Sequence, residues 1–268
     1  MAINEAYNVD CIEYMRTWPD TCFDLAVCDP PYGSGNNPKL GGGKRFGGIF
    51  DRYCKLEQTQ RRKTGEVLLP SPTNGRREIG SENGSGDTSS RTEYNRGGVL
   101  QAPTWDVAPP QLFFDELFRV SKNQIIWGGN YFSLPPTRCF LVWKKTNIAE
   151  GFSMAMCEYA WTSFKGNAKV FDYSSLRKDN SGKFHPTEKP QELYAWTYKL
   201  FVDKNQTVFD PMMGSQASRV VAYKMGIDYI GCEIDKYYFD KGCEFFNREC
   251  LGTKKTENGK SITQLNLF

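Results

Sequence analysis

Four consecutive residues, Asp29-Pro30-Pro31-Tyr32, combine the groups that can hold a planar amine. Proline has a fixed φ and no amide hydrogen, so the tetrad predicts a stiff turn with one carboxylate, bare carbonyls and one aromatic ring. The amino group of adenine or cytosine is a poor nucleophile because its lone pair is delocalised into the ring. If Asp29 accepts one N–H and the Pro30 carbonyl the other, the nitrogen becomes pyramidal and can attack a methyl donor. Tyr32 can stack on the base, which must first be flipped out of a duplex.

The residues before the tetrad indicate where it lies. Phe23–Cys28 is an apolar run that predicts a short buried strand. The tetrad then follows the end of a strand, and in open α/β sheets ligands bind at that rim. Prolines and a tyrosine also occur in polyproline ligands of adaptor domains, but these lie in exposed polar tracts. The position therefore favours a catalytic turn over a polyproline ligand.

A second strand–turn–helix unit lies late in the chain. A strand over 206–210 leads through Pro211-Met212-Met213-Gly214-Ser215-Gln216 into a helix over 217–225, and a strand over 228–233 ends in an acid. Gly214 allows the backbone to approach a ligand, and the helix N-terminus attracts an anionic group. Glu233 lies 23 residues after Asp210, near the spacing of an acid that binds ribose hydroxyls. Because G-x-G-x-x-G is absent, the pattern favours a nucleoside ligand without a pyrophosphate.

Two shorter segments can also face a ligand. In His185-Pro186-Thr187-Glu188-Lys189-Pro190, which precedes a predicted helix, Thr187 and Lys189 can hold a carboxylate at the helix entry. A proline-punctuated loop is the alternative. Asp10 precedes another predicted helix, which it can cap, or it can face the ligand at the sheet rim.

The two strand–turn units must meet for these residues to act together. In a doubly wound sheet, the strands that end at Asp29 and Asp210 can be neighbours at the switch point, with their C-terminal ends side by side. We therefore expect one site that receives the base and the methyl donor. The remaining elements predicted from hydrophobic spacing are helices over 12–17, 110–120 and 192–201, and strands over 124–127, 139–143 and 158–164.

Composition narrows the class of protein. The 268 residues, 39% of them hydrophobic and 14% aromatic, suffice for one large α/β domain, and the net charge of +3 does not by itself announce a nucleic-acid partner. No apolar run has transmembrane length, and no signal peptide is expected. Nine cysteines without a C-x-x-C pair fit a reducing cytoplasm, and a single histidine argues against a histidine-based zinc site, so no metal is expected.

Two polar segments are candidates for DNA contact. Residues 33–98 hold 14 glycines, and residues 39–98 hold 12 Lys or Arg against 7 Asp or Glu, a net charge of +5. This predicts a flexible, basic, glycine-rich insertion over 36–98 that can contact phosphates, with a solvated loop as the alternative. The shorter polar segment 164–184 is the second candidate, with a surface loop as its alternative.

The combination of motifs resembles the β-class amino DNA methyltransferases, in which the catalytic tetrad comes first and the cofactor motif last. The resemblance covers about residues 4–35 and 105–250. It implies a doubly wound, mostly parallel, seven-stranded α/β sheet of the Rossmann-like methyltransferase type, with S-adenosylmethionine as cofactor. It also implies methyl transfer to adenine N6 or cytosine N4 of double-stranded DNA, in the setting of restriction–modification. Aspartate at the head of the tetrad favours adenine N6.

The resemblance also assigns roles by matching position. The catalytic residues would be Asp29, Pro30, Pro31 and Tyr32. The cofactor would be held by Asp10 and Cys11 near its adenine, by Asp210, Pro211, Met213, Gly214 and Ser215 at its methionine part, by Glu233 at its ribose, and by Thr187 and Lys189 at its carboxylate. This sequence departs from the family in two ways: Gln216 stands where a second glycine is frequent, and the long insertion directly follows the tetrad.

The expected organisation is a methyltransferase domain over 1–250 and a tail over 251–268. The last five residues, Gln264–Phe268, resemble the peptide by which bacterial replication proteins dock on the sliding clamp, although a tail folded back on its own domain is the alternative. We expect a cytoplasmic, nucleoid-associated protein of a bacterium or a phage-infected cell. The other functions to weigh are transfer to cytosine N4, RNA or a protein glutamine, and a non-catalytic DNA-binding protein on the same scaffold.

Overall fold

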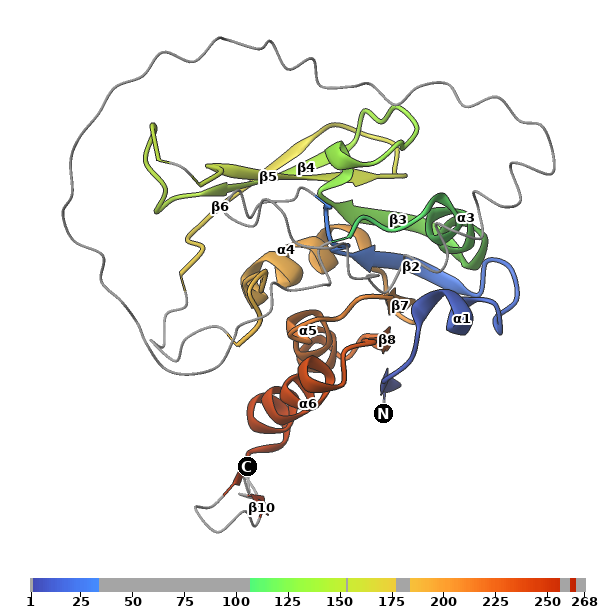
Figure 1. Cartoon of the computed structure of the whole chain (residues 1–268), viewed down its shortest axis with the longest axis vertical. Helices are drawn as coiled ribbons and strands as arrows, with labels where there is room; N and C mark the ends of the chain where they lie inside the picture. Colours follow the sequence, from blue (N-terminus) through green and yellow to red (C-terminus); the bar gives the residue numbers. More distant parts are fainter. Residues whose placement is uncertain (1, 34–106, 153, 177–183, 256–260, 264–268) are drawn as a thin grey trace, which may run out of the picture. The chain divides into compact units, whose positions relative to one another are not determined.

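The computed structural model describes residues 2–33, 107–152, 154–176, 184–255 and 261–263 (Figure 1). The described residues up to Gly33 and from Ala108 belong to one compact unit. Its strands are β1 (Asn4–Tyr7), β2 (Phe23–Cys28), β3 (Ser121–Trp127), β4 (Phe140–Lys145), β5 (Cys157–Thr162), β6 (Lys169–Tyr173), β7 (Thr207–Asp210), β8 (Asp228–Cys232), β9 (Thr253–Lys255) and β10 (Ser261–Thr263). Its helices are α1 (Cys11–Met15), α3 (Gln111–Val120), α4 (Gln191–Phe201), α5 (Ala217–Met225), α6 (Lys236–Leu251) and the 3-10 turn η1 (Gly129–Tyr131).

Eight of the described strands form one sheet in the order β1-β8-β7-β2-β3-β5-β4-β6, and β9 and β10 form a separate pair. In sheet order, β1, β8, β7, β2 and β3 are each parallel to their neighbours. Strand β5 runs antiparallel to both β3 and β4, and β6 is parallel to β4. The predicted α/β class and mostly parallel sheet are confirmed. The predicted number of seven strands was wrong, because β6 adds an eighth at the edge.

Strand β2 lies in the parallel half of the sheet, between β7 and β3 (Figure 1). Its residues alternate between the two faces, and the run from Leu25 to Cys28 is buried on both. Leu25 and Val27 join the core that α4 and α5 cover, while Phe23 stacks on Phe209 at a centroid distance of 4.5 Å. A continuous apolar run of this kind is typical of a parallel strand covered by helices on both sides.

Helices cover both faces of the sheet (Figure 1). Helix α5 packs between α4 and α6, while α1 packs against α3, and α3 also packs on β3. Apolar residues at helical spacing explain these contacts: Phe113, Leu117 and Val120 of α3 are fully buried. The doubly wound arrangement predicted from the sequence is therefore present.

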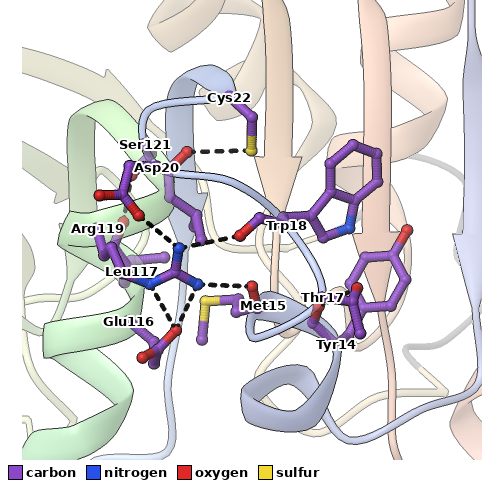
Figure 2. A network of polar contacts seen from close by, with 11 residues as sticks. Tyr14, Met15, Thr17, Trp18, Asp20, Cys22, Glu116, Leu117, Arg119 and Ser121 are labelled. Atoms are coloured by element: carbon purple, nitrogen blue, oxygen red, sulfur yellow. Dashed lines mark hydrogen bonds and ion pairs between the residues drawn. The ribbon is translucent and has the colours of Figure 1, made fainter.

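The side chain of Arg119, near the end of α3, ties that helix to the loop before β2 (Figure 2). Its guanidinium donates to the carbonyls of Met15 and Trp18, each at 2.9 Å, and pairs with Asp20 at 2.8 Å and Glu116 at 2.7 Å. A planar guanidinium with five N–H donors suits several acceptors at once. One side chain thus fixes the approach of the chain to the central strand.

Several elements differ from the sequence-based expectations. Helices α3, α4 and α5 and strands β2, β7 and β8 lie within one residue of their predicted bounds, and α1 ends two residues earlier than predicted. Strands β1, β6, β9 and β10 and helix α6 were not predicted. Strand β6 lies inside the polar segment 164–184. It was not predicted because Val170 and Asp172 face outward on this edge strand, which weakens its apolar pattern. Residues 36–98 and Gln264–Phe268 lie outside the described residues.

No helix in the described ranges is both long enough and apolar enough to cross a membrane. Among the same residues, no three His, Cys, Asp or Glu side chains gather in a way that could hold a metal ion.

Candidate active site

Five parallel strands end at one edge of the sheet, and the sequence motifs follow their ends. Moving across the sheet, the order is β1, β8, β7, β2 and β3. The residues after these strands are, in the same order, Asn8–Asp10, Glu233, the turn that begins at Pro211, the tetrad that begins at Asp29, and Gly128. The strand ending before Asp29 and the strand ending at Asp210 are direct neighbours, as predicted.

The Asp29 carboxylate is held from two sides. Its Oδ1 accepts a hydrogen bond of 2.8 Å from the Tyr32 hydroxyl, and its Oδ2 pairs with the Lys189 ammonium. Burial raises the pKa of Asp29 above its ordinary value, although Lys189 opposes that shift. A carboxylate offers about four lone-pair positions, so two donors leave acceptor capacity for an incoming amine.

Lys189 lies among acceptors from different parts of the chain. It is 4% exposed, and its ammonium also approaches Glu158 Oε2 at 3.3 Å. Glu158, on β5, pairs in turn with Lys145 on β4 at 2.7 Å. Charges of alternating sign therefore run from Lys145 through Glu158 and Lys189 to Asp29. The sequence did not predict the contact between Lys189 and the tetrad.

The Tyr32 ring is placed by the segment after β3. Tyr131 stacks on it, with the ring centroids 4.7 Å apart and an angle of 15° between the planes. Gly128, at φ +67°, lies so close that a Cβ added there would overlap the Tyr32 ring. Tyr131 is 53% exposed. An aromatic ring on this face indicates a stacking platform that extends outward from the tetrad.

The Asp210 side chain closes the turn after β7. Its Oδ2 accepts from the Ser218 hydroxyl at 2.6 Å, and its Oδ1 accepts from the Met212 amide at 3.1 Å. Burial raises the pKa of Asp210 to about 7, and the hydrogen bond from Ser218 limits the rise. The carboxylate thus ties the turn to the first residues of α5. Pro211, Met213 and Ser215 of the turn are buried as well.

Glu233 is bonded to the glycine-bearing turn. Its Oε2 accepts from the Gly214 amide at 2.9 Å, and its Oε1 accepts from the Asp235 amide at 2.8 Å. Burial raises the pKa of Glu233 above its ordinary value. The Asn8 side chain donates to the Glu233 carbonyl at 2.8 Å, which joins the loop after β1 to the same acid.

His185 and Gly214 are in close approach. Gly214 has φ +50°, and a Cβ added there would lie 3.0 Å from His185 Nε2. The imidazole packs edge-on against Tyr238 at 4.4 Å. Burial lowers the pKa of His185 to about 4, and the charge of Lys189 contributes to this shift. The His185–Pro190 segment thus contacts the Gly214 turn through His185 and the tetrad through Lys189.

The other predicted cofactor residues have local partners. Asp10 caps α1 by accepting from the Ile12 amide at 2.9 Å and the Glu13 amide at 3.2 Å. Cys11 is buried, and desolvation raises its pKa well above the ordinary value. Thr187 is exposed, with its hydroxyl 3.3 Å from His185 Nδ1. The roles of these residues toward a cofactor stay predictions.

The sequence analysis did not single out Glu158, Tyr131 or Gly128. The Gly128-Gly129 pair after an apolar run was the available signal for a close backbone approach at a strand end. Glu158 gave no signal, because an acid at the start of a strand is ordinary until tertiary contacts bring a lysine to it.

The described arrangement defines a class of protein. A solved structure, PvuII DNA methyltransferase (cytosine-N4-specific), shares the fold with a TM-score of 0.50 at 12% identity, covering 95% of this chain and 93% of that chain. The parallel sheet with helices on both faces, and with carboxylates and a glycine-bearing turn at the ends of adjacent strands, is a Rossmann-like α/β fold.

The matched family makes the assignment specific. The family described as DNA methylase, which covers N6 and N4 methyltransferases, matches residues 119–244. Over these residues the chain is similar to the N6/N4 DNA methylases. The match includes the segment at His185 and the turn at Gly214, whereas the tetrad precedes it.

Two curated relatives resemble most of the chain. Type II methyltransferase M.HinfI of Haemophilus influenzae is 24% identical over 89% of this chain and 67% of its own length. Type II methyltransferase M.BglII of Bacillus subtilis is 22% identical over 98% of this chain and 74% of its own length.

Proposed function

We propose that this DNA methyltransferase transfers a methyl group from S-adenosylmethionine to the N6 amine of adenine in double-stranded DNA. One observation carries the proposal. The His185–Pro190 segment contacts both halves of the site, since Lys189 pairs with Asp29 while His185 packs on Gly214. The tetrad, where the methyl acceptor would bind, and the Gly214 turn, where the cofactor would bind, follow the ends of neighbouring strands, which supports the proposal.

The acceptor half would hold the target amine. The Asp29 carboxylate accepts one N–H and the Pro30 carbonyl accepts the other, so that the nitrogen lone pair is directed outward. Both acceptors are held before reaction: Asp29 by Tyr32 and Lys189, and the Pro30 carbonyl by Pro31, which restricts the backbone of the residue before it. The exposed ring of Tyr131, stacked on Tyr32, extends an apolar surface for a flipped base.

The cofactor half has the chemistry that a nucleoside with an amino-acid tail requires. Gly214 has φ +50°, which suits a residue without a Cβ, and its backbone lies close to the His185 ring at the turn before α5. Glu233 offers a buried carboxylate for ribose hydroxyls, and Asp10 and Cys11 would lie near the adenine. When bound, S-adenosylmethionine supplies an electrophilic methyl group. Asp210 holds the turn in place through Ser218 and Met212.

The strongest direct test is the chemical identity of the product. Purified protein is incubated with S-adenosylmethionine and duplex DNA of mixed sequence, the DNA is digested, and the nucleosides are identified by mass spectrometry. We expect N6-methyladenine from the wild type and a loss of at least about 100-fold in Asp29→Ala. The control is Asp240→Ala, an exposed aspartate on α6 that pairs only locally with Lys236.

Other outcomes would redirect or reject the proposal. N4-methylcytosine in place of N6-methyladenine would assign the enzyme to the other acceptor of the same family. Methylated RNA or glutamine, with unmodified DNA, would reject DNA as the substrate. Binding of DNA without any methylated product would favour a non-catalytic protein on this scaffold.

The DNA contacts and the clamp contact are proposals from the sequence. We place phosphate contacts in the basic insertion 36–98 and along residues 164–184, where Lys165 and Lys169 are exposed. Gln264–Phe268 is a candidate docking peptide for a sliding clamp. A pull-down with purified clamp that compares the full chain with one lacking these five residues tests it, and equal retention of both would reject it.

A further inference from the structure

Lys189 is almost fully buried, and its ammonium faces the tetrad. The Lys189 ammonium forms ion pairs with Asp29 Oδ2 and with Glu158 Oε2, the latter at 3.3 Å, and it donates to the Tyr32 hydroxyl at 3.5 Å. A cofactor carboxylate would have to compete with these oxygens for the ammonium.

Aromatic rings complete the surroundings of the ammonium. It lies 5.7 Å from the centre of the Trp127 ring and 6.0 Å from the centre of the Tyr32 ring. Both distances suit attraction between a cation and a ring face. Lys189 is therefore fixed by groups from β3, β5 and the tetrad, which together build a socket on the acceptor side of the site.

Glu158 belongs to the same socket. Its Oε1 pairs with Lys145 at 2.7 Å, so its charge is compensated on the side away from Lys189. Burial would raise the pKa of Glu158, but Lys189 and Lys145 lower it below the ordinary value, which keeps it ionised at neutral pH. An ionised Glu158 can hold the Lys189 ammonium beside Asp29.

We propose that Lys189, held by Glu158, is a positioning residue for Asp29 and does not bind the cofactor's carboxylate. This inference rests on the proposed methyl transfer and deepens it. Asp29 can accept an amine N–H at either oxygen only while it is ionised, because a protonated carboxyl group turns one acceptor into a donor. Lys189 opposes the effect of burial on Asp29 and fixes the direction of its oxygens.

Other titratable groups face this pair and enter any dependence on pH. Burial would lower the pKa of Lys189, but Asp29, Tyr32 and Glu158 raise it well above the ordinary value. Asp29 or Lys189 also interacts with Cys28 in β2, Tyr194 in α4, Asp210 at the end of β7 and His185 in the segment of Lys189 itself. Lys189→Met and Glu158→Gln should shift the pKa of Asp29 in opposite directions, which distinguishes their effects from those of these neighbours.

The test uses the full chain with Lys189→Met, Lys189→Arg and Glu158→Gln. Three quantities are measured for each: the Kd of S-adenosylmethionine by calorimetry, the single-turnover rate of DNA methylation as a function of pH, and the pKa of the Asp29 carboxyl group by carbon NMR. The NMR signal is assigned by its absence in Asp29→Asn.

We expect Lys189→Met to slow transfer about 100-fold at neutral pH while the Kd of S-adenosylmethionine changes less than about threefold. In Lys189→Met the pKa of Asp29 should rise, so that the acidic limb of the rate profile moves to higher pH. Glu158→Gln should lower the pKa of Asp29 and move the acidic limb to lower pH, because it removes a negative charge near Asp29. Lys189→Arg should recover part of the lost rate, since it restores the positive charge.

A different pattern would overturn the inference. If Lys189→Met weakens S-adenosylmethionine binding more than about tenfold and leaves the maximal transfer rate unchanged, Lys189 binds the cofactor. If Lys189→Met does not fold, an unchanged pKa of Asp29 in Glu158→Gln overturns the proposal. If the wild type methylates no DNA, the proposed function fails, but the carbon NMR comparison still decides whether Lys189 and Glu158 set the state of Asp29.

Discussion

His185 is the single histidine of the chain, so its imidazole can be followed by NMR without assignment. Burial lowers its pKa to about 4, with Lys189 as a second cause. We predict that the imidazole signals of the folded protein titrate near pH 4. They should titrate higher in Lys189→Met, because a nearby positive charge is removed. A transition near 6.5 in the wild type would show that His185 does not pack on Gly214 as described.

The same shift makes folding stability depend on pH. Between the lowered pKa of about 4 and the ordinary value of 6.5, the unfolded chain binds a proton at His185 that the folded chain does not. The stabilising contribution is present above pH 6.5 and is lost as the pH falls toward 4. Urea denaturation should give a smaller loss of unfolding free energy across this range in His185→Gln than in the wild type. Equal losses would contradict the prediction.

Two glycines with nearly the same backbone conformation provide a matched pair. Gly128 has φ +67° and lies against the Tyr32 ring, whereas Gly226 has φ +68° with nothing within 4 Å of an added Cβ. Alanine at either position strains the backbone by roughly 1 kcal/mol. We predict that Gly128→Ala also displaces Tyr32 and lowers the methylation rate at least about tenfold, while Gly226→Ala keeps it. Similar rates in the two variants would argue against the placement of Tyr32.

At the scale of elements, strand β2 carries the tetrad and Arg119 fixes the chain that enters it. Arg119→Ala removes the donor to two carbonyls and two ion-pair contacts. We predict a loss of about 1–3 kcal/mol in the free energy of unfolding. Arg16→Ala, an exposed arginine at the end of α1, is the control and should change it by less than about 0.5 kcal/mol. Denaturant titration of both variants measures this, and equal losses would contradict the role of the network.

The elements that the sequence predicted were those with a strong local pattern. The continuous apolar run of β2 and the helical spacing in α3 gave their bounds within one residue. Strand β6 was missed because Lys169, Val170 and Asp172 are exposed on an edge strand, and only Phe171 and Tyr173 pack partly against the core, which is too short a pattern to recognise. The contact of Lys189 with Glu158 depends on the antiparallel insertion of β5 beside β3, which a local pattern cannot encode.

At the scale of the whole molecule, the described residues on either side of the basic insertion lie close together. A Cβ added at Gly33 would lie 2.8 Å from the Ala108 amide nitrogen, so these two residues of the compact unit are adjacent in space. We predict that replacing residues 36–98 with a short glycine–serine linker leaves the fold and the Kd of S-adenosylmethionine unchanged. DNA affinity and its salt dependence should both fall, because a net charge of +5 is removed.

A variant of unchanged length separates the effect of the insertion's charge from the effect of its presence. Glutamine at Arg61, Arg62, Lys63, Arg76 and Arg77 keeps the insertion but lowers its charge. Fluorescence anisotropy with labelled duplex DNA at several salt concentrations should show a weaker salt dependence in both variants. An unchanged slope in both would place the phosphate contacts elsewhere, with residues 164–184 as the next candidate.

The central claim is that the ends of β2 and β7 form one site with separate tasks, the first for the target base and the second for the cofactor. The most direct measurement is the single-turnover rate of methyl transfer from protein loaded with S-adenosylmethionine to DNA, compared between the wild type and Asp29→Ala. We predict an unchanged Kd for the cofactor and a transfer rate at least about 100-fold lower in the variant. Transfer at the wild-type rate by Asp29→Ala would contradict the claim.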